Sequence, residues 1–225
     1  MQKTLDSTVS LDGMMSFSMV NYTGANERRL VVEHQLQRTP NLVMISGRDM
    51  FGRQLPVSII VPEGSHYYQL RRDTDGPCAI RFFGECLAQP CTGMSDINAL
   101  TFSMLSFTKD SIFNESGSEY VAHLFATEPG QSKIGIFDGN GKVQHIDCGF
   151  TEPAEHIVIK SLEHGTWHIL RRINGSYVNV SDNPTASPVV FPTKEGFGIY
   201  NDEISEINLA SVRYVYMAFQ RKEVL

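Results

Sequence analysis

Two segments of the chain alternate apolar and other side chains in the manner of β-strands. Residues 118–126 read SEYVAHLFA and residues 213–220 read RYVYMAFQ. A period of two places successive side chains on opposite faces of a sheet. In the second segment Tyr216 falls on one face and Met217 and Phe219 fall on the other, so both faces are apolar. This pattern predicts strands in the middle of a sheet, covered on both sides.

Similar short apolar segments recur along the whole chain, separated by Gly, Pro, Asn and Asp, as in proteins built from strands and turns. The 13 Phe, 8 Tyr, 18 Gly and 10 Pro residues suit the same architecture. No window has a sustained helical period. The single helical candidate is SDINALTFSML at residues 95–105, where Ser95 is a suitable N-cap. The sequence therefore predicts an all-β fold.

Four landmarks occur in the same order in the two halves of the chain, which is the signature of an internal repeat. They are a strand with a Gly/Asn turn, a proline before an apolar run, an aromatic segment ending in Leu-Arg-Arg, and a closing pair of strands. In the first half they occupy residues 17–26, 39–46, 66–73 and 102–126, and in the second half residues 133–142, 152–160, 166–173 and 197–220.

Matches within these landmarks are residue-specific. Residues 70–72 and 170–172 both read Leu-Arg-Arg, and a tyrosine precedes a phenylalanine by five positions at the end of each half. We therefore predict two tandem sandwich-like modules related by internal duplication. The modules span residues 13–127 and 131–220, between an N-terminal extension at 1–12 and a C-terminal tail at 221–225. The turn-like boundary predicts a tight junction.

Charge and hydropathy exclude several classes of function. Nineteen Lys and Arg residues against twenty-five Asp and Glu residues give a net charge of −6. A nucleic-acid partner would require a basic face, so we expect none. No segment approaches the roughly 20 apolar residues of a membrane-spanning helix, and the polar start lacks the apolar core of a secretion signal. We expect no membrane insertion and assembly in a cytoplasm.

The cysteines do not form a metal-binding pattern. They are Cys78, Cys86, Cys91 and Cys148, and their spacing lacks the two tight pairs, or the histidine partners, of a zinc site. In a reducing compartment such residues are mostly free, buried thiols. We expect no metal and no other cofactor.

Other candidate site residues have simpler structural interpretations. His164 and His168 are four residues apart, but the repeat places them on or beside a strand, where this spacing does not converge on a metal. The segment DGNGK at residues 138–142 lacks the ligands that complete a calcium loop, so we predict a hairpin turn. Nothing distinguishes a glycosidase pair among the scattered acids Asp96, Asp110, Glu119, Asp202 and Glu203.

The sequence also lacks a P-loop, a dinucleotide-binding fingerprint, a nucleophile elbow and a zinc-protease motif. We therefore predict no catalytic, cofactor-binding or metal residues, and a protein that is not an enzyme. Tyr67, Tyr68 and Trp167 are aromatic residues suited to stacking on a sugar. We interpret them as core residues, which is the commoner role of such aromatics in a sandwich.

Several segments resemble a module found in bacteriophage tail-fibre and other virion structural proteins. That module opens with an aromatic-Thr-Gly-Asn strand and turn, continues with a Gly-Phe-x-Pro segment before an apolar run ending in Lys, and closes with a Tyr-Val/Ile-Tyr-Met-Ala-Phe strand. The matching segments are residues 137–141, 149–153, 157–160 and 214–219, together with the joining segment 120–135. The first half departs more, since Leu36 and Gln37 replace Gly-Phe and Ser46 replaces the Lys.

This resemblance implies a virion structural protein of tail-fibre, adaptor or decoration type that acts by assembly and attachment. Its partners would be other virion proteins and further copies of itself, with a trimer favoured. Its location would be the virion, assembled in the bacterial host cytoplasm. The alternative is a receptor-binding module for a host surface glycan, with an aromatic-lined groove near Tyr67 or Trp167. The resemblance assigns no role to the cysteine-rich segment at residues 78–91.

Overall fold

The computed structural model describes residues 16–36, 38–63, 66–71, 97–100, 104–108, 113–162, 167–180, 189–200 and 207–220. This part of the chain contains sixteen β-strands and no helix, which confirms the predicted all-β class. Within it, no helix is long and apolar enough to cross a membrane.

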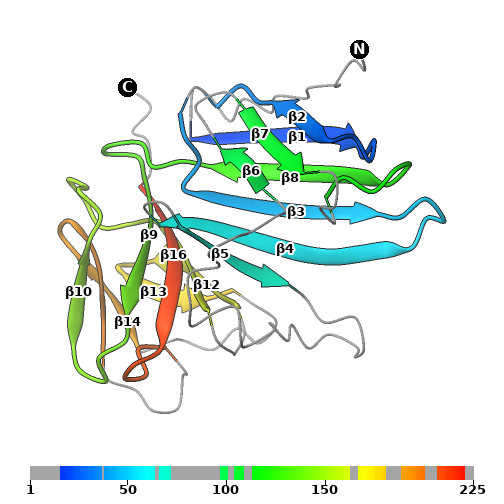
Figure 1. The fold of residues 1–225 in the computed structure, drawn as a ribbon. Helices are drawn as coiled ribbons and strands as arrows, with labels where there is room; N and C mark the ends of the chain where they lie inside the picture. Colours follow the sequence, from blue (N-terminus) through cyan, green and yellow to red (C-terminus); the bar gives the residue numbers. More distant parts are fainter. Residues whose placement is uncertain are drawn as a thin grey trace. The chain divides into compact units, whose positions relative to one another are not determined.

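The chain divides into two compact units, Met1–Ala126 and Thr127–Leu225. Each unit holds eight strands in its described part (Figure 1). The strands of the first unit are β1 (Phe17–Thr23), β2 (Arg29–Glu33), β3 (Leu42–Arg48), β4 (Gln54–Glu63), β5 (His66–Arg71), β6 (Ile97–Leu100), β7 (Met104–Thr108) and β8 (Glu119–Phe125). Those of the second unit are β9 (Ser132–Asp138), β10 (Gln144–Asp147), β11 (His156–Ser161), β12 (Trp167–Ile173), β13 (Ser176–Asn179), β14 (Val190–Thr193), β15 (Gly196–Ile199) and β16 (Arg213–Phe219).

The two units have the same strand topology. The first unit has a five-stranded sheet in the order β1-β8-β3-β4-β5 and a three-stranded sheet in the order β2-β7-β6. The second unit has the orders β9-β16-β11-β12-β13 and β10-β15-β14. Each strand of the first unit therefore has a counterpart eight strands later, at the same place in its sheet. All of these pairings are antiparallel.

Each unit is sandwich-like, with a hydrophobic core that draws on both of its sheets. In the second unit the core joins Ile157 and Leu170 of the five-stranded sheet to Phe197 and Ile199 of the three-stranded sheet. In the first unit Val32 of β2 packs with residues of β1, β3 and β8. Apolar side chains on facing sheets are thus removed from water, which is the main stabilising term of such a fold.

The closing strands lie inside their sheets, as the alternating pattern predicts. Strand β8 is paired on one side with β1 and on the other with β3, and β16 is paired with β9 and β11. In β16 the five residues 214–218 are all buried, so both faces are covered. Phe219 is only half-buried. Truncation of Phe219 to alanine should therefore cost less than the roughly 3–5 kcal/mol typical of a fully buried phenylalanine.

The third landmark of the sequence repeat is misaligned. Leu70 lies on β5, whereas Leu170 lies on β12, whose counterpart in the first unit is β4. The registers give the correct match: Val43 of β3 pairs with Ile60, and Ile157 of β11 pairs with Leu170. Leu70 and Leu170 therefore occupy strands that are not equivalent. The second landmark is aligned correctly, because Ser46 faces Val121 in the first unit as Lys160 faces Val215 in the second.

The segment at residues 138–142 does not form a hairpin, contrary to the sequence prediction. Strand β9 before it belongs to the five-stranded sheet and β10 after it belongs to the three-stranded sheet, so the segment crosses between sheets. Gly141 has a positive φ of 63°, which suits glycine. Gly139 is required for space, because a Cβ there would lie 2.1 Å from the carbonyl oxygen of Leu209.

The segment proposed as a helical candidate contains two strands. Residues 97–100 form β6, and the stretch from 104 belongs to β7. The two strands pair antiparallel with each other, with Leu100 opposite Leu105. Tertiary pairing thus decides this segment over a weak local signal.

Candidate functional site

Most residues considered from the sequence are not brought together. Cys148 is a free, buried thiol, and Cys78, Cys86 and Cys91 lie outside the described residues. His168 lies on β12, while His164 lies outside the described part. The described residues contain no group of three or more His, Cys, Asp or Glu side chains that could hold a metal ion.

The acids and aromatics are also dispersed. Four of the acids, Asp96, Asp110, Asp202 and Glu203, fall outside the described residues. Tyr67 and Tyr68 lie on β5, and Trp167 is half-buried on β12. Of this set, Glu119 alone lines a described hollow.

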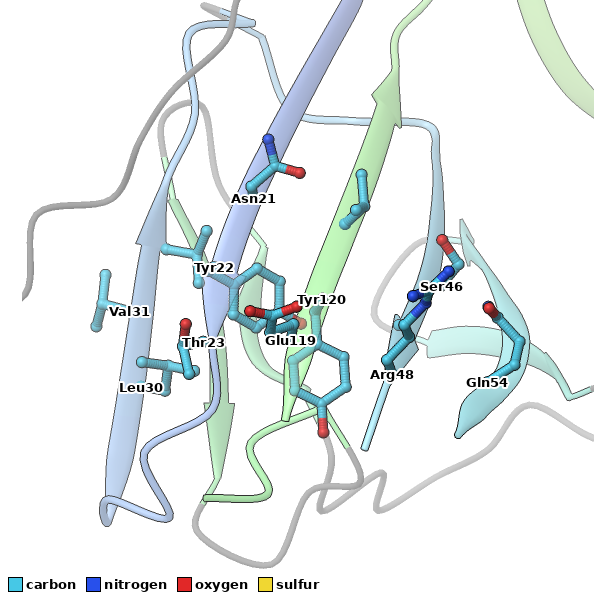
Figure 2. A pocket seen from close by; sticks show the side chains of 13 residues that line it. Asn21, Tyr22, Thr23, Leu30, Val31, Ser46, Arg48, Gln54, Glu119 and Tyr120 are labelled. Atoms are coloured by element: carbon cyan, nitrogen blue, oxygen red, sulfur yellow. The ribbon is translucent and has the colours of Figure 1, made fainter. Parts of the chain in front are cut away.

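This hollow lies in the first unit and has a volume of about 640 Å³ (Figure 2). Five strands line it. The lining residues are Asn21, Tyr22 and Thr23 of β1, Leu30, Val31 and Val32 of β2, Ser46, Gly47 and Arg48 of β3, Gln54 of β4, and Glu119, Tyr120 and Val121 of β8. In Figure 2, Leu30 and Val31 lie on one side of the hollow and Arg48 and Gln54 on the other.

The polar side of the hollow is a row of directly opposed residues. Thr23 pairs with Glu119, Glu119 with Arg48, and Arg48 with Gln54, so one row crosses four strands. All four residues are exposed. Neither Arg48 nor Glu119 forms an ion pair with another described residue. A carboxylate and a guanidinium are thus both available to a ligand.

Strand β2 supplies the apolar side. The side chain of Val31 is 40% exposed, although valine side chains are usually buried in the protein interior. Val32, on the opposite face of the strand, belongs to the core. The hollow therefore offers an apolar wall that is open to solvent beside the polar row.

One buried asparagine fixes the loop between β1 and β2. The Oδ1 atom of Asn114 accepts hydrogen bonds from the backbone N–H groups of Ala25 and Asn26, each at 3.1 Å. Its Nδ2 atom donates to the carbonyl oxygen of Glu27 at 3.0 Å. Because β1 and β2 both line the hollow, Asn114 positions its apolar wall.

Asn208 makes the equivalent contacts in the second unit. Its Oδ1 atom accepts a hydrogen bond from the backbone N–H of Asn140 at 2.9 Å, and its Nδ2 atom donates to the carbonyl oxygen of Lys142 at 2.6 Å. The sequence analysis missed this pair. The available signal was an asparagine six residues before Tyr120 and another six residues before Tyr214.

A tight turn between β3 and β4 projects beside the hollow. This tip, residues 49–53, presents Met50 and Phe51, which are 65% and 74% exposed. They are the most exposed large apolar side chains of the described residues. Sequence patterning gave no signal for them, because exposure of a side chain in a short turn is decided by tertiary structure.

Hydrogen bonds hold the tip in one conformation. The Oδ1 atom of Asp49 accepts from the backbone N–H groups of Phe51 and Arg53, and its Oδ2 atom accepts from Arg53 Nε at 2.6 Å. Desolvation raises the pKa of Asp49, but these bonds outweigh it and hold the pKa below its usual value. The Arg53 guanidinium lies 5.4 Å from the centre of the Phe51 ring, within cation–π range.

The second unit differs at the positions equivalent to the polar row. Lys160 and Leu162 stand where the first unit has Ser46 and Arg48, and both are fully buried. Asp138 and Arg213, at the places of Thr23 and Glu119, form an ion pair of 2.8 Å. The first unit thus carries four exposed polar residues in this row, whereas the second unit has an ion pair at two of the equivalent positions and the buried Leu162 at a third.

The second unit has an exposed aromatic surface of its own. Phe191 on β14 lies across Gly198, where a Cβ would be 2.1 Å from the ring. Its centroid is 4.3 Å from that of Tyr200 and 5.5 Å from that of His145. Tyr200 is 46% exposed. We refer to Phe191, Tyr200 and His145 as the aromatic surface.

Comparison with known proteins gives one match. A family model described as "Domain of unknown function (DUF7483)" matches residues 2–222. No curated protein and no solved structure matches the chain. A single match spans both units, so the pair of units, and not one sandwich, is what the family model describes.

Proposed function

This chain belongs to the DUF7483 family, and we propose that it is a structural protein of a bacteriophage particle, of tail-fibre, adaptor or decoration type. It acts by assembly and attachment and not by catalysis. Its partners are other virion proteins and further copies of itself. Its location is the virion.

The observation that carries this proposal is the contrast between equivalent faces of the two units. Ser46 and Arg48 line an open hollow, whereas Lys160 and Leu162 at the same positions are fully buried. A chain built from two similar sandwiches can use the buried face of one to hold its own fold together and the open face of the other to bind a partner protein. This division of roles suits a protein that links components of a particle.

Internal duplication is part of the proposal. It is supported by the identical strand order of the units and by the matching contacts of Asn114 and Asn208. Tyr120 and Tyr214 also occupy equivalent places, since their hydroxyl groups accept hydrogen bonds from the backbone N–H groups of Glu115 and Leu209. Contacts this specific favour a common ancestor of the units over independent use of one architecture.

The test is to locate the protein in purified particles of the phage that encodes it. We expect quantitative mass spectrometry to find it at a fixed copy number per particle, and labelling with an antibody fragment to place it at one site on the particle. Its absence from particles that have been purified to constant composition would refute the proposal.

A glycan-binding role is the second candidate, and the aromatic surface favours it. The exposed ring of Tyr200 and the half-buried ring of Phe191, beside the exposed imidazole of His145, provide both a stacking face and a hydrogen-bonding group for a sugar. The aromatic surface, with His145 on β10, Phe191 on β14 and Tyr200 directly after β15, is a second candidate site beside the surroundings of Tyr67 and Trp167.

Binding to an array of bacterial surface glycans tests this role. Tyr200→Ala should abolish any binding, while Ile173→Ala, at a residue of the same unit that is similarly exposed at 43% but lies on the other sheet, should leave it unchanged. Equal binding by the parent and by Tyr200→Ala would remove the aromatic surface from consideration.

A further inference from the structure

The tip at residues 49–53 combines exposure with rigidity. Met50 and Phe51 are mostly exposed, and the Asp49 side chain fixes the backbone on both sides of them. The fold does not need two apolar side chains at this place, because neither belongs to a core cluster. Rigid, exposed apolar anchors of this kind are typical of protein interfaces, since little conformational entropy is lost on binding.

The tip and the hollow are neighbours on one surface. Arg48 and Gln54 line the hollow, and the tip is the segment that connects them. The tip cannot fill the hollow of its own chain in this structure, because Phe51 remains 74% exposed. A second copy of the chain can supply a tip to that hollow.

The chemistry of the two features is complementary. The hollow has an apolar wall at Leu30 and Val31 and a carboxylate at Glu119 that, like the neighbouring guanidinium of Arg48, forms no ion pair with another described residue. The tip has an apolar ring at Phe51 and a guanidinium at Arg53, whose side chain is 76% exposed. Insertion would bury the ring against the wall and bring opposite charges together, and Arg53 keeps its other N–H groups free for Glu119 while Nε stays on Asp49.

A two-fold axis is the simplest symmetry for this contact. An axis that lies in the interface and passes midway between tip and hollow exchanges their positions, so the tip of each copy meets the hollow of the other. Such an interface is self-complementary, as in most protein dimers. We infer that two copies of this chain dimerise through the first unit, with the Met50–Phe51 tip of each copy inserted in the hollow of its partner. The inference goes beyond the proposed function and does not depend on it.

The test compares three variants of the full chain by light scattering coupled to size exclusion over a range of concentrations. The tip variant carries Met50→Ser and Phe51→Ser. The hollow variant carries Val31→Arg, which occupies the hollow and repels Arg53. The control carries Val143→Ser, at a residue of the second unit that is 52% exposed. Melting curves equal to that of the parent establish that each variant is folded.

We expect the parent and the control to be dimers, and both other variants to dissociate with a dissociation constant raised by at least about 30-fold. Mixing the tip variant with the hollow variant should restore pairing, because one intact tip then meets one intact hollow. A parent that runs as a single chain at 100 µM, taken here as roughly the weak end of specific association, would overturn the inference. So would a tip variant that dimerises like the parent, a mixture that stays monomeric, or a trimer that depends on the tip.

Discussion

Substitution of Asn208 should destabilise the second unit through two separable effects. The side chain is 2% exposed and bonds the backbone of Asn140 and Lys142, as well as the side chain of Gln144. Its backbone has a positive φ of 70°. Alanine at this position loses the hydrogen bonds and also strains the backbone, because a left-handed conformation is costly for a residue with a Cβ and no polar side chain.

The magnitude follows from these contacts. The two hydrogen bonds to the backbone contribute about 1 kcal/mol each, and the one to Gln144 contributes less because water can partly replace it at this half-buried side chain. The left-handed backbone adds about 1–2 kcal/mol for alanine. We expect Asn208→Ala to lower the free energy of unfolding by roughly 3–4 kcal/mol, and Asn208→Gly to lower it by about 2 kcal/mol, since glycine accepts this φ.

Asn114 is the matched control. Its side chain bonds three backbone groups of the corresponding loop, but its φ is not positive. There, glycine should be worse than alanine by about 0.5–1 kcal/mol, because glycine has the larger conformational entropy to lose. The order of the two substitutions should therefore reverse between Asn208 and Asn114.

Urea unfolding provides the measurement. The chain has one tryptophan, Trp167, and it lies in the second unit, so its fluorescence follows the unit that contains Asn208. Circular dichroism follows the whole chain and reports on the Asn114 variants. If Asn208→Gly is no more stable than Asn208→Ala, the backbone argument is wrong. A loss below about 0.5 kcal/mol for Asn208→Ala would show that water replaces all of its hydrogen bonds.

Three further predictions concern the same unit. Phe197→Ala should cost about 3–5 kcal/mol and half-buried Phe219→Ala clearly less, and equal midpoints in urea would contradict this difference. Gly139→Ala should cost about 3 kcal/mol, because the new Cβ would meet the Leu209 carbonyl, and a melting temperature equal to that of the parent would rule out this clash. Burial raises the pKa of the Cys148 thiol to about 12 from 9.0. The unfolded chain releases this proton first, so the free energy of unfolding should fall by up to about 1.4 kcal/mol per pH unit between pH 9 and 12. If a Cys148→Ala variant loses the same free energy of unfolding between pH 9 and 12, other groups cause the loss.

Local sequence patterns predicted the structure correctly where the property belongs to a single strand. The alternation around Tyr216 and Met217 predicted a strand covered on both faces, and both residues are buried. The proline and apolar run of the second landmark also gave the correct match, as the registers of Ser46 and Lys160 show. The alternation of buried side chains and the point where a strand begins are properties of a single segment, so the sequence can reveal them.

Local sequence patterns did not predict features that depend on which strands pair with each other. Leu70 and Leu170 are each followed by two arginines but have different places in their sheets. The turn at Gly139 has the composition of a hairpin, yet it connects two sheets, because β9 pairs with the distant strand β16. The hollow arises in the same way, since its lining comes from strands that are far apart in the chain.

The place of the closing strand has a consequence for how each unit folds. Strand β8 enters between β1 and β3, and the pairing of Phe17 with Phe125 joins residues more than a hundred positions apart. Until that strand has arrived, β1 and β3 each expose an unpaired edge that can recruit another chain. Pairing across so long a loop is slow. Folding intermediates of this protein should therefore be most prone to aggregate just before the last strand of a unit inserts, and expression at low temperature or with a chaperone that shields strand edges should raise the soluble yield.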